Sequence, residues 1–144
     1  EPTKNTKAFV LANIDYSERL KNGEQISFPP ILNANSKIED YSEWTNRPDM
    51  FLPADADETY GKIIGANAEA TTIITWLKKE SPIEVHETEF ERFLILEGTC
   101  DITIGATVYH LKTGDYKEIP LFTPHSLIVT SKTPCKVILQ RVAA

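Results

Sequence analysis

The 144-residue sequence has no long hydrophobic run, no cluster of basic residues and few cysteines, and each shortage excludes a class of protein. No stretch approaches the roughly 18 consecutive apolar residues that span a membrane. The net charge is −6 and no run is rich in Lys or Arg, whereas a nucleic-acid surface needs a basic face. We therefore expect neither a membrane nor a nucleic acid as a partner.

The two cysteines, Cys100 and Cys135, do not form a C-x-x-C pair, which excludes the common zinc and redox motifs. Each lies among apolar residues. This pattern predicts two small buried hydrophobic side chains, with a disulfide between neighbouring strands as the alternative. The chain starts at Glu1 rather than Met. We expect a cytoplasmic protein, and the earlier removal of a signal peptide is the alternative.

The sequence changes character near residue 60. Residues 1–60 hold five of the nine prolines and only short hydrophobic runs, so we expect an arm that packs on a barrel formed by residues 61–144. Trp44, Phe51 and Tyr60 supply anchors for this arm. The elements expected within it are helical turns over 15–21 and 36–44, with Ser36 and Glu39 at capping-box spacing, and edge strands over 9–11 and 26–28.

From residue 60 onward, short runs rich in Ile, Val, Thr and aromatic residues alternate with turn residues about every ten positions. The predicted strands are 62–65, 71–78, 83–86, 92–96, 100–104, 107–111, 116–119, 126–129 and 136–142. No helix of ten residues fits between them, which excludes parallel βαβ units. The pattern is typical of an all-β sandwich or barrel.

The three histidines are few enough for their placement to be informative. In a strand, Glu84 and His86 share a face because side chains two positions apart point the same way. Glu91 follows shortly, and His125 opens a distant strand. Carboxylate and imidazole groups brought together in this way are ligands for one divalent ion. His110 is expected on the surface of a strand.

The segment around these residues resembles the first motif of the cupin superfamily. That motif has Gly, five residues, His-x-His, three or four residues, Glu, six residues and Gly. His86, Glu91 and Gly98 match at the required spacing, whereas Glu84 replaces the first His and Lys78 the leading Gly. The resemblance implies an all-β, cupin-type jelly-roll barrel, also called a double-stranded β-helix.

The second cupin motif has Gly, five residues, Pro-x-Gly, two residues, His, three residues and Asn. Gly114, Pro120 and His125 match it, whereas Phe122 replaces the Gly and Val129 the Asn. Turn geometry that needs a positive φ explains the glycines of both motifs. The resemblance covers about residues 60–142 and leaves the arm unexplained.

In metal-binding members of this family, three His and one Glu usually hold the ion. The resemblance therefore implies a divalent metal site, for Fe, Mn, Zn or Ni, at Glu84, His86, Glu91 and His125. His86, Glu91 and His125 form the two-His-one-carboxylate set of non-haem Fe(II) sites, with Glu84 as a fourth ligand or as a hydrogen-bond acceptor that fixes an imidazole. A hydrogen-bonded His86–Glu91 pair in a cupin without metal is the alternative.

Strand alternation also predicts the walls of a pocket for a small-molecule ligand, because residues two apart from Glu91 or His125 share their face. Trp76 and Phe122 are expected at its mouth, with ordinary core packing as the alternative. The predicted pocket-lining residues are Trp76, Phe93, Ile95, Phe122, Leu127 and Val129.

Three functions are compatible with this pattern, since one barrel hosts many unrelated activities. The first is a metal-dependent enzyme that acts on a small molecule, such as an oxygenase or an isomerase. The second is a ligand-binding or sensory cupin that lacks metal and turnover. The third is a structural module whose pocket its own side chains fill. Small cupins often dimerise through edge strands and arms, so we also expect a homodimer.

Overall fold

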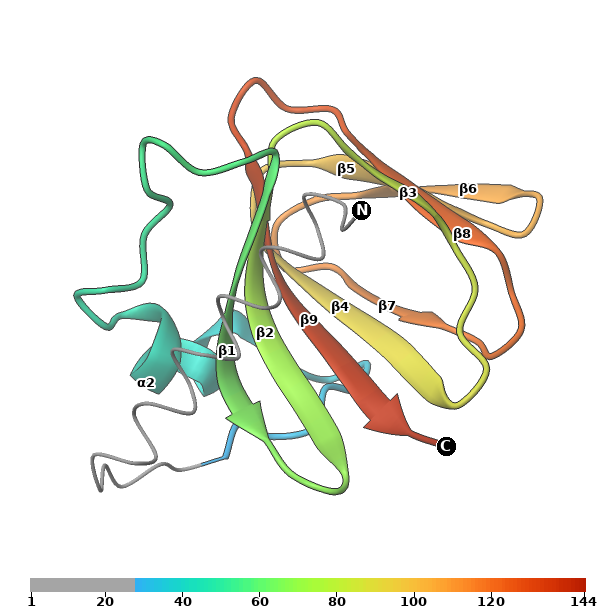
Figure 1. The fold of residues 1–144 in the computed structure, drawn as a ribbon, viewed down its shortest axis with the longest axis horizontal. Helices are drawn as coiled ribbons and strands as arrows, with labels where there is room; N and C mark the ends of the chain where they lie inside the picture. Colours follow the sequence, from blue (N-terminus) through green and yellow to red (C-terminus); the bar gives the residue numbers. More distant parts are fainter. Residues whose placement is uncertain (1–27) are drawn as a thin grey trace.

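Two antiparallel sheets face each other in the computed structural model, which describes residues 28–144 (Figure 1). The five-stranded sheet has the order β1 (Thr59–Ala66), β2 (Ala70–Leu77), β9 (Cys135–Ala143), β4 (Glu89–Glu97) and β7 (Tyr116–Ile119). The four-stranded sheet has the order β3 (Glu80–Glu84), β8 (His125–Val129), β5 (Cys100–Ile104) and β6 (Thr107–Leu111). The predicted all-β jelly-roll class is confirmed.

Within residues 28–144, helical structure is confined to a 3-10 turn, η1 (Ile38–Tyr41), and one helical turn, α2 (Ser42–Thr45). Neither helix is long and apolar enough to span a membrane, and no other helix is found over residues 28–144. Each predicted strand beyond residue 60 has a counterpart among β1–β9, since alternating apolar residues bury one face of each strand.

One predicted strand is displaced. β3 covers Glu80–Glu84 rather than 83–86, so His86 follows the strand instead of closing it. Pro82 reads as a turn in the sequence, but it is tolerated here because β3 is the edge strand of its sheet and its register shifts between Ser81 and Glu84. The prediction that Glu84 and His86 share the face of one strand is therefore wrong, because His86 lies outside β3.

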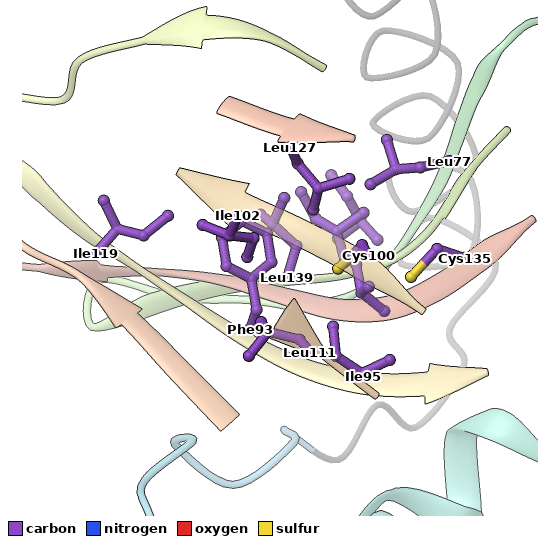
Figure 2. Close-up of a cluster of buried hydrophobic side chains, with 13 residues drawn as sticks. Leu77, Phe93, Ile95, Cys100, Ile102, Leu111, Ile119, Leu127, Cys135 and Leu139 are labelled. Carbon is purple, nitrogen blue, oxygen red and sulfur yellow. The ribbon is translucent and has the colours of Figure 1, made fainter. Parts of the chain in front are cut away.

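The main core fills the space between the two sheets (Figure 2). Phe93 and Ile95 of β4 and Leu139 of β9 come from the larger sheet, and Ile102 and Leu127 come from the smaller one. All are buried because alternate side chains of each strand point inward. This core holds the strand ends that carry the candidate site in place.

A second apolar cluster lies on the outer face of the larger sheet. Residues before β1 supply Leu32, Tyr41, Trp44 and Met50, which pack against outward-facing residues such as Ile138. The described part of the predicted arm, residues 28–58, therefore covers the sheet face opposite the main core. Figure 1 shows η1, α2 and the segment that leads to β1 on that side.

A buried glutamine ties this segment to the sheet. Gln140 on β9 is fully buried, and its Oε1 accepts a hydrogen bond of 2.8 Å from the backbone N–H of Leu32. Its Nε2 donates to the Pro30 carbonyl at 3.1 Å and to the Thr72 hydroxyl at 2.9 Å. The amide is satisfied only when the segment lies against β9, so it fixes the position of that segment.

Several details of the arm differ from the sequence predictions. Asp40, rather than Glu39, reaches back to the amide of Lys37, so the capping interaction begins one residue after Ser36. The Ser36 hydroxyl instead accepts a bond from the amide of Asn33. Phe51, which was predicted to anchor the arm, is exposed, and the neighbouring Met50 is buried instead. The predicted elements at 9–11 and 15–21, and most of 26–28, lie outside the described residues.

Turn geometry agrees with the expectation for two glycines. Gly98 has φ 81° and Gly114 has φ 92°, in the left-handed region that other residues rarely adopt. At Gly98 a side chain would also meet the Ser131 hydroxyl at 2.8 Å. These two turns close the connections on either side of the β5–β6 hairpin.

The two cysteines are free and buried, as predicted. Their thiols contact each other across β5 and β9, and this hydrogen bond together with burial raises the pKa of Cys100. We expect both thiols to resist an aromatic disulfide reagent in the folded protein and to react fully in denaturant. Mass spectrometry after alkylation checks this, and an unfolded protein with no reactive thiol would contradict it.

Candidate metal centre

Four predicted site residues meet at one end of the space between the sheets. Glu84 ends β3 and His125 begins β8, both in the smaller sheet, and Glu91 lies in β4 of the larger sheet. His86 lies in the connection between β3 and β4. The site therefore combines two facing sheets and one connection, and its residues are brought together by the closure of the barrel.

The donor atoms of these residues are close together. Nε2 of His86 lies 2.8 Å from Oε2 of Glu91 and 3.5 Å from Oε2 of Glu84. Nε2 of His125 lies 3.3 Å from Oε1 of Glu91 and 4.0 Å from Oε2 of Glu84. One donor atom from each residue lies within 4.8 Å of all the others. Ligands about 2.1 Å from a shared ion are roughly 3.0–3.4 Å apart, so this spacing suits one ion.

Well-aligned hydrogen bonds do not account for the whole cluster. Nε2 of both histidines and Oε2 of Glu91 are buried, and none makes a well-aligned hydrogen bond within residues 28–144 despite the short separations. Buried polar atoms are nearly always satisfied, and exceptions call for an explanation such as an ion. The residues therefore fit a divalent metal, and the 2.8 Å contact between His86 and Glu91 also fits the metal-free pair.

Backbone contacts orient the two imidazoles. Nδ1 of His125 lies 3.3 Å from the carbonyl oxygen of Thr123; donation of Nδ1–H to this carbonyl leaves the Nε2 lone pair for an ion. The carbonyl of His86 accepts a 2.8 Å bond from the amide of Phe122. The connection before β8 is thus tied to the connection after β3, which holds the two rings 5.0 Å apart.

Charge within the cluster favours an ionised carboxylate. Burial alone raises the pKa of Glu91, but contact with His125 and His86 and the nearby guanidinium of Arg141 outweigh burial and lower this pKa to about 2. Burial alone lowers the pKa of His125, but contact with Glu91 outweighs it and raises this pKa. The ionised carboxylate is thus available as a ligand, and His125 must release its proton before it binds an ion.

A cavity of about 40 Å³ extends from this cluster into the barrel. It is small, since an apolar cavity that accepts benzene measures about 150 Å³. The residues that line it are Thr59, Thr75, Leu77, Ser81, Glu84, Glu91, Phe93, Leu127, Leu139 and Arg141.

Two of the six predicted pocket residues, Phe93 and Leu127, line this cavity. Ile95 is fully buried in the core below it, and Val129 packs against the same core without lining the cavity. The prediction that Ile95 and Val129 line the pocket is therefore wrong. Alternation along a strand determines which face a side chain is on, but it does not determine how far along the strand the cavity extends.

The predicted mouth residues also need correction. Trp76 points to the outer face of β2 and packs in the second cluster, as the core-packing alternative stated. Phe122 is 68% exposed and has φ 58°. It occupies the cupin Gly position with the backbone conformation that favours glycine, and its side chain lies in solvent.

The structure adds cavity residues that the sequence analysis did not select. Arg141 on β9 lies opposite Glu91 of β4, with Nε 3.5 Å from Glu91 Oε2. The sequence could have indicated Arg141, because Val137 and Leu139 point inward and Arg141, two residues further along β9, shares their face. No such indication existed for Thr59, because β1 begins at this residue and the predicted strand began at residue 62. His110 is exposed and pairs with Asp101, as expected for a surface residue.

Residues 76–140 match the model of the cupin domain family. This region of the chain is a domain of the cupin superfamily. The matched region contains all four residues of the candidate metal centre, and the resemblance seen in the sequence is confirmed.

One curated relative of this cupin is quercetin 2,3-dioxygenase of Bacillus subtilis, with 42% identity over 45 residues. That match covers 31% of this chain and 13% of the dioxygenase, so the chain corresponds to a small part of that protein.

Solved structures show the same fold. A predicted oxalate decarboxylase from Thermotoga maritima has a TM-score of 0.57 at 18% identity, over 60% of this cupin and 81% of that chain. A protein of unknown function from Streptococcus pyogenes has a TM-score of 0.57 at 16% identity, over 84% of this cupin and 98% of that chain.

Proposed function

We propose that this cupin binds a divalent metal ion through Glu84, His86, Glu91 and His125 and a small molecule in the adjoining cavity. The observation that carries the proposal is the convergence of four donor atoms within 4.8 Å from three separate strands and one connection. Imidazole and carboxylate ligands suit Fe, Mn, Zn or Ni. When bound, such an ion supplies a Lewis acid or a site for O₂.

The chain's own residues support this chemistry. Glu91 stays ionised and offsets the charge of an ion, and the Thr123 carbonyl fixes the ring of His125. Arg141 lines the cavity beside Glu91, where its guanidinium can orient an anionic ligand. Phe93, Leu127 and Leu139 make the wall apolar and limit access of water.

The proposed activity is that of a metal-dependent oxygenase or isomerase. The 45-residue similarity to a quercetin dioxygenase supports an oxygenase, and the oxygen- and nitrogen-rich ligand set is compatible with either reaction class. The homodimer expected from the sequence stays a prediction.

Elemental analysis tests the metal site. We expect wild-type protein, expressed without a histidine tag and reconstituted with Fe, Mn, Zn or Ni, to retain close to one ion per chain. His86→Ala and His125→Ala should lose at least about tenfold in affinity, since each removes a ligand. His110→Ala is the matched control, because its ring is 80% exposed and distant from the site in the smaller sheet.

Wild-type protein that holds no metal after reconstitution would overturn the metal proposal. Binding of an organic ligand by such protein would instead support the ligand-binding cupin without turnover. Equal metal retention by His86→Ala and His110→Ala would place the ion elsewhere.

A further inference from the structure

The two cysteines of this chain contact each other inside the main core. Cys100 begins β5 in the smaller sheet, and Cys135 begins β9 in the larger one. They are the only cysteines in the sequence, and a thiol–thiol hydrogen bond joins them across the space between the sheets. Figure 2 shows the two sulfur atoms close together in this core. Other small apolar side chains would fill both positions equally well, so the pairing of the two cysteines points to thiol chemistry.

A close approach of two backbone segments brings these strand starts together. Gly98 lies two residues before Cys100 and has φ 81°. A methyl group at Gly98 would lie 3.1 Å from Cys135 Cα and 3.0 Å from the Pro134 carbonyl oxygen. The chain that enters β5 therefore runs directly against the start of β9, at a distance that only glycine allows.

The Ser131 hydroxyl ties the two strand starts to each other. It accepts a 3.0 Å bond from the amide of Thr99, which precedes Cys100, and donates a 2.9 Å bond to the Thr133 carbonyl in the turn before Cys135. A disulfide forms without backbone movement only where two cysteines already lie close together. Because the backbone is held on both sides, the folded protein keeps the two thiols in contact.

Burial protects this pair from reagents in the folded protein. Cys100 is 1% exposed and Cys135 is 0% exposed. A redox reagent larger than water therefore reaches the sulfur atoms only when the barrel opens. The redox state of the pair is thus decided while the chain folds, and the folded protein then retains it.

The pair lies away from the candidate metal centre. Cys100 lies opposite Val129, the last residue of β8, whereas His125, the first residue of β8, lies opposite Ile104. At about 3.3 Å per residue, this places the cysteines roughly 13 Å along the barrel from His125. A covalent bond between the cysteines therefore leaves the four candidate ligands in place.

We propose that Cys100 and Cys135 form an intramolecular disulfide that joins the two sheets when the chain folds in the presence of a low-molecular-weight disulfide such as oxidised glutathione. One protein thiolate attacks oxidised glutathione, forms a mixed disulfide and releases one glutathione. The second protein thiolate attacks the protein sulfur of that mixed disulfide, forms the Cys100–Cys135 bond and releases the second glutathione. The protein thiols lose two electrons and two protons, and both pass to the two glutathione molecules.

Refolding in a glutathione buffer tests this disulfide. Reduced wild-type protein is diluted from urea into roughly 10 mM reduced and 0.1 mM oxidised glutathione, quenched with acid and mapped by peptide mass spectrometry. We expect more than about nine in ten chains to carry the crosslink, whereas the same buffer in concentrated urea should leave the thiols reduced. The ratio of disulfide to dithiol should thus be at least about 100-fold higher in the folded protein, because only the fold holds the sulfur atoms together.

Thermal unfolding gives a second readout. The crosslink closes a loop of roughly 35 residues in the unfolded chain and should raise the Tm by roughly 5–10 °C. Cys100→Ser is the matched control, because serine is similar in size but forms no disulfide. Its Tm should be the same after refolding in oxidising and in reducing buffer. The peptide map of wild-type protein needs no variant, so it decides the proposal even when Cys100→Ser does not fold.

The outcomes are independent of the metal proposal. Wild-type protein that refolds with two free thiols, or with glutathione adducts only, overturns the disulfide. A crosslinked protein with a lower Tm than the reduced protein also overturns it, because the bond would then strain the fold. Reduced and crosslinked protein should bind metal with affinities that agree within about twofold. Crosslinked protein that holds no ion overturns the metal proposal alone, and metal-loaded protein with free thiols overturns the disulfide alone.

Discussion

Glu91→Gln is expected to lower the free energy of unfolding of the metal-free protein by about 3 kcal/mol near pH 6. The pKa of Glu91 falls from 4.5 to about 2 on folding, and each unit corresponds to about 1.4 kcal/mol. Glu91 is 3% exposed, so solvent screens its contacts with His86, His125 and Arg141 only weakly. Urea unfolding in the presence of a chelator measures this difference.

The effect of Glu91→Gln on stability is expected to depend on pH. A carboxyl whose folded pKa is depressed stabilises the protein above its unfolded pKa, and this contribution is lost as pH falls from about 4.5 to about 2. His125, whose folded pKa is raised, contributes below its unfolded value of 6.5 and loses this contribution as pH rises further. The difference between wild type and variant should therefore be largest between roughly pH 4.5 and 6.5.

Glu118→Gln is the control for this experiment, since Glu118 forms a part-exposed pair with Arg92. We expect its effect to stay within about 1 kcal/mol. A Glu91→Gln effect of similar size, or one that does not change between pH 6 and pH 3, would contradict the assignment of Glu91 as the charged centre of the cluster.

Gln140→Leu is expected to destabilise the protein by about 3 kcal/mol. Leucine has a similar volume, but it leaves the Leu32 amide without its 2.8 Å acceptor and removes two donated bonds. Urea unfolding measures the loss, and limited trypsin digestion at Lys37 reports release of the segment before β1. Cleavage there should become faster than in wild type.

Thr72→Val is the matched control for Gln140, because it removes only one of the three hydrogen bonds. We expect a loss of about 1 kcal/mol and no faster cleavage of the segment. Equal losses in both variants would show that the bonds to Leu32 and Pro30 contribute nothing to its docking.

Strand positions could be predicted because each buried strand face imposes a period of two on the sequence. The residues of the candidate metal centre could also be predicted, because His86, Glu91 and His125 have the spacing of the cupin motifs. Predictions about single side chains failed where something other than strand alternation determined their position. His86 reaches the cluster from a connection, Trp76 is covered by the segment before β1, and Phe122 lies in a connection with its side chain in solvent.

The sequence by itself thus determined the all-β class, the family and the four residues of the candidate metal centre, because local alternation and motif spacing carry that information. Only the tertiary structure decided which residues share the cavity with them. Arg141 and Thr75 reach it because β9 and β2 lie beside each other in the larger sheet, although they are far apart in sequence. Whether a buried hydroxyl has a partner is likewise a property of packing, since it depends on atoms that distant strands supply.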